Sequence, residues 1–289
     1  MALRVNHTTT YTYSEPVSIC HTEVCLKPRT SAAQTLLEHE LVIVPAPEVS
    51  IARQDYFGNT VTYFSSQEPH LKLTITAHSV VEVHTSDPLQ PRLTPKWEQV
   101  SEEVRHYDRA ETFDALQFVF ESPRVRTARE FADYARPSFP AGRPLLEGAL
   151  DLCGRIYKEF KYDQRATTVS TPVDEVLRIR HGVCQDFAHL MIACLRSIGL
   201  PARYVSGYLR SGRNSVGSEA SHAWASVFCS GFGWLDLDPT NNLMPAANHV
   251  TAAWGRDYSD VSPVKGVALG GGEQAIKVGV DVAPVPVQY

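Results

Sequence analysis

One helix-like segment constrains this chain more than any other stretch. Beyond Gln185, apolar residues recur at the i, i+3, i+4, i+7 spacing of a helix buried along one side: Phe187, Leu190, Met191, Cys194, Leu195 and Ile198. Gly199 stands where a glycine ends such a helix, and Pro201 prevents it from resuming. Cys184 lies in the first turn, where unpaired N–H groups and the helix dipole favour a thiolate. Cys184 is therefore either a nucleophile or a small buried hydrophobe, and this stretch alone does not decide between them.

The composition is that of an ordinary soluble globular protein. The chain has 289 residues, enough for two domains, with 43% hydrophobic and 20% charged residues. A net charge of −5 offers no electrostatic footprint for nucleic acid or anionic membrane, and no stretch approaches the ~20 apolar residues that span a bilayer. The N-terminus lacks the apolar run of a signal peptide, and the six cysteines are unclustered. We therefore expect a cytoplasmic protein without nucleic-acid or membrane partners, and nothing here indicates an oligomeric state.

Residues 1–85 have the pattern of short β-strands. Leu71, Leu73 and Ile75 alternate with polar neighbours, and residues 57–59 suit a hairpin turn between two strand-like runs. Several short strands at this spacing predict an N-terminal β-sandwich domain. Cys20 and Cys25 are spaced wrongly for a C-x-x-C metal site and are expected to be buried thiols.

The rest of the chain divides into a connector and a core. Residues 86–142 are rich in proline and charge and are predicted to be a connector with one short helix over 127–135. Residues 143–289 are predicted to form the core, with its C-terminal strands included. Its elements are helices over 145–160 and 173–179, the second capped by Thr171, strands over 202–209, 223–228 and 234–238, a loop over 211–219, and a final strand over 276–282 with one buried face.

A cysteine nucleophile needs a base, and the base needs an orienting acceptor. His222 opens one predicted strand, and Asp238 closes the strand that pairs with it through the turn at 230–233. The two residues should lie opposite each other at the open end of this hairpin, where cross-strand Cβ atoms are roughly 5 Å apart. Asp236 has the same parity and points to the same face. The spacing favours Asp238 but leaves Asp236 open.

A metal site is the competing interpretation of the same region. His181, Cys184 and His189 could be offered as ligands together with His222. Five residues separate Cys184 from His189, which puts them on different helix faces, and no paired C-x-x-C supports zinc. We expect neither metal nor organic cofactor, and we expect His189 to be a partly buried helix residue with a hydrogen-bond partner.

The motifs taken together resemble the bacterial transglutaminase-like family, which belongs to the papain-like cysteine-nucleophile superfamily that also contains the animal transglutaminases. The matching core segments, in chain order, are residues 182–190, 202–208, 221–224 and 233–241. Residues 11–17 and 55–59 resemble the β domain that precedes this core in many bacterial members, and residues 255–261 resemble their C-terminal segment. The resemblance covers nearly the whole chain.

This resemblance implies a fold and a set of roles. The fold is α+β, with the N-terminal β-sandwich followed by a papain-like, transglutaminase-type core in which the nucleophile helix packs on an antiparallel sheet. Cys184 would be the nucleophile and His222 the base and acid. The family pattern places the acid immediately before Pro-Thr-Asn, which selects Asp238 over Asp236 as the orienting carboxylate.

The implied activity is amide chemistry on a peptide or protein substrate through a thioester. The resemblance leaves hydrolysis and transfer to an amine both open, with hydrolysis slightly favoured, and the calcium-binding segments of the animal enzymes have no match. Gln185, Tyr208, Trp224 and Asp257 are candidates for lining the cleft, although core packing is the simpler expectation for Trp224. The alternative function is a catalytically silent module that binds peptide on the same fold.

Overall fold

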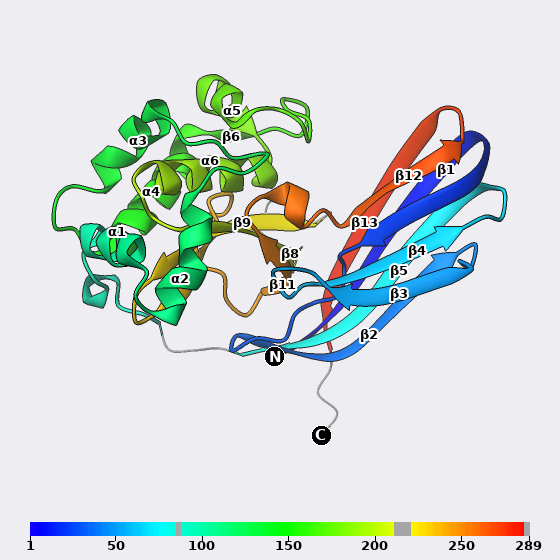
Figure 1. Ribbon diagram of the computed structural model, residues 1–289, viewed down its shortest axis with the longest axis horizontal. Coiled ribbons are helices and arrows are strands. Elements are labelled where there is room, and N and C mark those ends of the chain that lie inside the picture. The colour runs from blue at the N-terminus through cyan, green and yellow to red at the C-terminus, as the bar shows by residue number, and fades with distance from the viewer. Residues whose placement is uncertain (85–87, 211–220, 286–289) are drawn as a thin grey trace.

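The computed structural model describes residues 1–84, 88–210 and 221–285, and it has two lobes (Figure 1). One lobe gathers the helices around a small sheet, and the other is an extended sheet that carries the N-terminus. The predicted α+β class and the N-terminal β region are confirmed. The loop predicted over 211–219 lies outside the described residues.

The elements have the following bounds. The α-helices are α1 (Trp97–His106), α2 (Ala110–Leu116), α3 (Arg129–Ala135), α4 (Leu145–Glu159), α5 (Val173–Ile179) and α6 (Cys184–Ser197), with 3-10 turns η1 (Pro91–Leu93), η2 (Gln117–Val119), η3 (Arg136–Ser138) and η4 (Tyr258–Asp260). The strands are β1 (Ala2–Val24), β2 (Gln34–Val44), β3 (Val49–Gln54), β4 (Thr60–Ser66), β5 (His70–Val83), β6 (Lys161–Tyr162), β7 (His181–Gly182), β8 (Ala202–Leu209), β9 (His222–Cys229), β10 (Gly233–Leu237), β11 (His249–Gly255), β12 (Val264–Gly270) and β13 (Gln274–Pro284).

The extended lobe is organised around β1, whose 23 residues are long enough to pair with several strands in succession. Its first half pairs with β5 and β13, and its second half pairs with β4 and β12. With β2 and β3 added, seven strands share one hydrogen-bonded sheet.

The C-terminal strands differ from the prediction in two ways. We assigned β12 and β13 to the core, but both hydrogen-bond to β1 of the N-terminal sheet. Only the end of β13 has a buried face: Val282 is 8% exposed, whereas Ile276 and Val278 are 56% and 42% exposed. The reason is that only this end packs on the core, in an apolar cluster that includes Tyr208 and Val250.

The predicted connector also belongs to the helical lobe. Helices α1, α2 and α3 place Val100, Ala115 and Phe131 in the same apolar cluster as α4 and α6. Helix α3 matches the short helix predicted over 127–135, whereas α1, which buries Val100, Ser101 and Val104 on one side, was not predicted. The predicted boundaries at 85/86 and 142/143 stay predictions.

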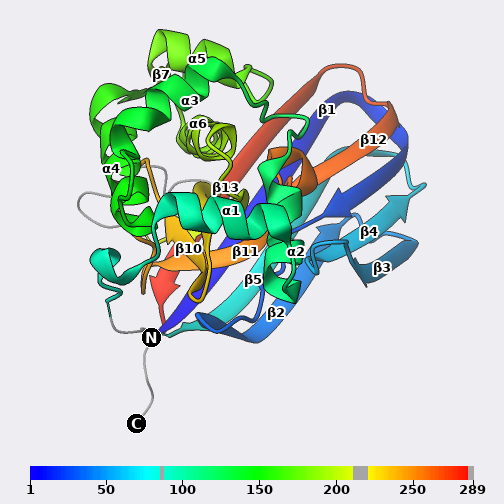
Figure 2. The same ribbon diagram turned by 60° about the vertical axis from the view of Figure 1, so that its left-hand side comes forward.

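The core sheet supports the nucleophile helix. Its strands run in the order β10-β9-β8-β11, and α6 packs against β8 and β9 (Figure 2 shows α6 nearly end-on between the other helices and the strands). Gly199 has φ +83° and ends α6 as predicted. Thr171 does not cap α5, since Pro172 precedes the helix and the Thr171 hydroxyl accepts the Thr168 N–H at 2.9 Å.

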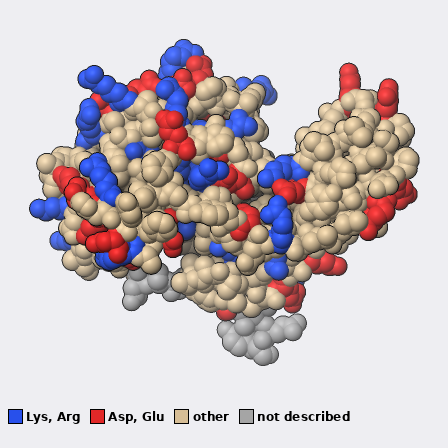
Figure 3. All heavy atoms as spheres, viewed as in Figure 1, with Lys and Arg blue, Asp and Glu red and all other residues tan. Residues whose placement is uncertain are grey.

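A groove of about 600 Å³ runs between the two lobes. Its lining includes charged side chains of both signs from each lobe, among them Glu23, Arg53, Arg256 and Lys265. Figure 3 shows such side chains at the base of the hollow between the lobes.

Candidate active site

The turn before α6 fixes where Cys184 emerges. Asp186 turns back and accepts the Val183 N–H at 2.8 Å and the Thr167 hydroxyl at 2.6 Å, which satisfies one of the free donors at the helix start. Gly182 is required by this arrangement, because a Cβ there would lie 2.7 Å from the Asp186 carboxylate. Cys184 is thereby held at the first helical position.

His222 and Asp238 are brought together as predicted, although not directly opposite each other. Leu237 pairs with Ala225, so Asp238 lies just past β10 and diagonal to His222 across the hairpin. Asp238 Oδ2 still lies 2.7 Å from His222 Nε2, and both side chains are fully buried.

The Asp-Pro-Thr-Asn turn supplies further donors to the Asp238 carboxylate. Oδ1 accepts the backbone N–H groups of Thr240 at 2.9 Å and Asn241 at 3.2 Å, and Oδ2 accepts the Asn241 side-chain amide at 2.8 Å. Burial acts to raise the pKa of Asp238, but its hydrogen bonds with the side chains of His222, His249 and Asn241, together with the charge of His222, lower it below the ordinary value. Asp238 is therefore held as a carboxylate.

The surroundings of His222 favour its charged form. Burial acts to lower the pKa of His222, but its interactions with Asp238 and Cys184 outweigh burial and raise that pKa to about 10. Nε2 is bonded to Asp238, which leaves Nδ1 for the thiol; Nδ1 makes no regular hydrogen bond to another described residue. The site can therefore support an imidazolium beside a thiolate.

Asp236, the alternative carboxylate, interacts with a different group. It is half-buried, and its charge acts on Arg203, whose pKa burial lowers to about 9. Cys194, on the apolar face of α6, is fully buried as the helical pattern predicts.

Two cleft candidates lie beside the predicted triad. Gln185 directly follows the nucleophile, and its side-chain amide donates to the Val169 carbonyl at 3.2 Å, next to the loop before α5. Trp224 is fully buried, with its ring centroid 6.1 Å from that of His222. It packs against the triad from within the core.

The other two cleft candidates have partners elsewhere. Tyr208 is buried in the seam between the lobes, where its hydroxyl pairs with His7 Nδ1 at 3.1 Å. Asp257 is fully buried and accepts the backbone N–H groups of Arg124 at 2.7 Å and Ser259 at 2.8 Å. The hydrogen bonds of Tyr208 and Asp257 therefore connect them to the surrounding structure rather than to the triad. The sequence did not show this, because side-chain type alone does not indicate which way a side chain points.

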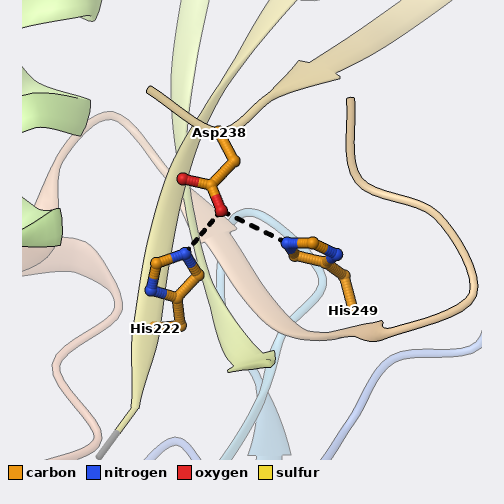
Figure 4. A group of neighbouring side chains, drawn as sticks. All are labelled: His222, Asp238 and His249. Atoms are coloured by element: carbon orange, nitrogen blue, oxygen red, sulfur yellow. Dashed lines mark hydrogen bonds and ion pairs between the residues drawn. The ribbon is translucent and has the colours of Figure 1, made fainter. Parts of the chain in front are cut away.

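The suggested metal-ligand set is not brought together. His189 is buried, accepts the Tyr258 N–H at 3.2 Å, and has its pKa lowered to about 3 by burial. The part of the chain that the structure describes instead contains one group with metal-ligating atoms in proximity, His222, Asp238 and His249, all within 4.8 Å of one another (Figure 4). In each pair with Asp238 the imidazole nitrogen lies at hydrogen-bond distance from Oδ2, so the observed geometry is that of a hydrogen-bonded cluster.

Asn241 and His249 are the site residues that sequence reasoning missed. Asn241 could have been found, because it belongs to the Asp-Pro-Thr-Asn segment that identified Asp238. His249 stands eleven residues beyond Asp238 and carries no periodic or motif signal.

Comparison with known proteins places this geometry in context. Residues 3–82 match the family model of the bacterial transglutaminase-like N-terminal region, and residues 132–239 match that of the transglutaminase-like superfamily. The uncharacterized protein Rv2569c of Mycobacterium tuberculosis is 42% identical over 97% of this chain and 92% of its own length. The chain belongs to the transglutaminase-like superfamily. Membership supports cysteine-nucleophile chemistry in general.

Two further relatives carry functional names. A protein-glutamine gamma-glutamyltransferase of Pseudomonas aeruginosa is 30% identical over 41% of this chain and 19% of its own length. A solved structure from Cytophaga hutchinsonii, described as a candidate cysteine protease, superposes with a TM-score of 0.79 at 22% identity, over 100% of this chain and 92% of its own. The latter likeness shows the shared fold.

All six cysteines lie within the described residues and are free and buried. Of the helices in the described ranges, none is long and apolar enough to cross a membrane.

Proposed function

We propose that this protein carries out amide chemistry with Cys184 as nucleophile, His222 as base and acid, and Asp238 as the orienting carboxylate. The observation that carries the proposal is the buried imidazole of His222, bonded to Asp238 at 2.7 Å through one nitrogen and available to Cys184 through the other. A carboxylate on one imidazole nitrogen fixes the ring so that the other nitrogen can exchange a proton with the thiol.

The proposed reaction has two halves. The Cys184 thiolate forms a bond to the amide carbonyl carbon, and the carbonyl electrons move to the oxygen, which the Cys184 backbone N–H at the start of α6 would help to stabilise. His222 gives its proton to the leaving nitrogen as the C–N bond breaks, which leaves a thioester. His222 then takes a proton from water or an amine. The oxygen or nitrogen that gives up this proton bonds to the carbonyl carbon as the C–S bond breaks.

We take the substrate to be a peptide or protein amide and favour hydrolysis over transfer to an amine. The fold shared with the candidate protease supports hydrolysis, whereas the partial match to a gamma-glutamyltransferase supports transfer. The chemistry needs a reduced thiol, which is consistent with the cytoplasmic setting predicted from the sequence.

The test is mass spectrometry of Cys184 after exposure to peptide and primary-amide libraries, with and without an added primary amine. We expect an acyl adduct on Cys184, absent in Cys184→Ala, that resolves to a free acid in water or to an amide with the amine. If broad libraries yield neither adduct nor product, the silent peptide-binding module becomes the better explanation.

A further inference from the structure

His249 contacts the predicted triad from a strand that the proposed mechanism does not use. It is the first residue of β11, its side chain is 5% exposed, and its Nε2 lies 3.3 Å from Asp238 Oδ2. His222 and His249 approach this oxygen from different sides, with the carboxylate between the two rings (Figure 4).

The hydrogen bond between His249 and Asp238 has the imidazole as donor and the carboxylate as acceptor. His249 Nδ1 is buried without a hydrogen-bond partner among the described residues, so a proton there would have no acceptor. The ring therefore carries its proton on Nε2 and donates to Oδ2.

Packing holds the His249 ring in this direction. The Trp224 ring meets it edge-on, with centroids 5.3 Å apart and planes at 85°, and the same indole lies beside His222. Gly207 of β8 makes room for the indole, because a Cβ there would lie 2.5 Å from the ring. The three rings form one packed group around Asp238.

The N-terminal lobe holds the strand that carries His249. Gln34 pairs with Thr251 of β11 as another strand would, accepting its N–H at 2.8 Å and donating to its carbonyl at 2.8 Å. Asn59 pairs in the same way with Trp254, at 3.0 and 2.8 Å. Both side-chain amides are buried, so β11 is fixed to the N-terminal region by hydrogen bonds that are partly shielded from water.

We propose that His249 is a positioning residue for the reaction assigned above: from a strand fixed to the N-terminal sheet, it holds Asp238 Oδ2 in the orientation that serves His222. The proposal rests on the proposed function, because positioning matters only if the His222–Asp238 pair acts on Cys184. It gives the N-terminal sheet a part in the reaction without contact to substrate.

The test compares two replacements of His249 that differ in their ability to donate. His249→Gln places an amide N–H near the position of Nε2, whereas His249→Leu fills similar space with no donor. We expect His249→Leu to lower kcat and the alkylation rate of Cys184 about ten-fold, the effect of losing one hydrogen bond to a buried charge, with KM unchanged. His249→Gln should recover most of that loss. Thermal unfolding checks that both variants are folded. If the two folded variants show the same kcat and the same alkylation rate, the inference is overturned.

The link to the N-terminal sheet has its own test. Gln34→Leu should also slow alkylation, and Gln34→Leu combined with His249→Leu should lose less than the product of the two single losses, because both act through β11. Fully multiplicative losses would overturn this link. Titration of the His222 ring by NMR separates the two proposals. The titration should differ between His249→Leu and His249→Gln even if wild-type Cys184 proves unreactive. An unreactive wild-type Cys184 would reject only the proposed function.

Discussion

Replacing Asp238 with asparagine should remove most of the special reactivity of Cys184 at neutral pH. The interactions of His222 with Asp238 and Cys184 raise its pKa from 6.5 to about 10 against the effect of burial. That difference corresponds to about 5 kcal/mol in favour of the imidazolium. If Asp238 supplies half of it, Asp238→Asn costs roughly 2–3 kcal/mol, or on the order of 50-fold in the population of the ion pair.

The assay is iodoacetamide alkylation of Cys184 between pH 5 and 10, followed by peptide mapping. At pH 7 we expect Asp238→Asn to react roughly ten- to fifty-fold more slowly than wild type, with the difference closing above pH 9, where an ordinary thiol ionises unaided. Asp236→Asn is the matched control, since Asp236 lies two residues away and interacts with Arg203. Equal losses in the two variants, or no loss in Asp238→Asn, would refute the reasoning.

Three further predictions concern the turn, the seam between the lobes and the response to acid. Gly182→Ala should displace Asp186, whose carboxylate lies 2.7 Å from the position of the new Cβ; it should slow Cys184 alkylation and lower the free energy of unfolding, measured with urea, by about 1–3 kcal/mol, and an unchanged free energy of unfolding would contradict this. Trp254→Ala removes a ring whose centroid lies 3.6 Å from the guanidinium carbon of Arg29 and 3.9 Å from that of Arg203. The loss should lower the free energy of unfolding in urea by about 2–4 kcal/mol. Stability equal to that of wild type would show that the stack contributes little. Burial lowers the pKa of His7 to about 4, so the folded state resists protonation of this ring. The contribution of His7 to the free energy of unfolding should be fully present above pH 6.5 and should fall by about 3 kcal/mol as the pH drops to 4. His7→Gln should reduce this fall when both proteins are unfolded by urea at pH 7 and at pH 4. An acid response identical in His7→Gln would count against that cause.

The local elements could be predicted because each has a period or a stop signal of its own. Helix α6 shows an apolar stripe from Phe187 and a terminating glycine, and the β9–β10 hairpin shows its turn at 230–233. These two elements carry Cys184, His222 and Asp238, so the candidate site could be proposed from the sequence.

Long-range pairing could not be predicted in the same way. The alternation in residues 276–282 indicates a strand but not its partner, and β13 pairs with β1 at the other end of the chain. The hydrogen bond from His249 to Asp238 likewise depends on how β11 lies against β8, and the 238–249 segment contains no feature that specifies this. The exact register of Asp238 against His222 was not predicted either. Strand β10 ends at Leu237, so Asp238 lies between the strand and the turn that orients its carboxylate.

The central claim, that His222 activates Cys184 as a nucleophile, is tested most directly by labelling with one equivalent of iodoacetamide at pH 7. Cys194, fully buried on the same helix, serves as the internal control. We expect wild-type Cys184 to react at least ten-fold faster than an ordinary exposed thiol, and His222→Ala to return it to the ordinary rate. A Cys184 that reacts no faster than an ordinary thiol, with a rate that His222→Ala leaves unchanged, would contradict the claim.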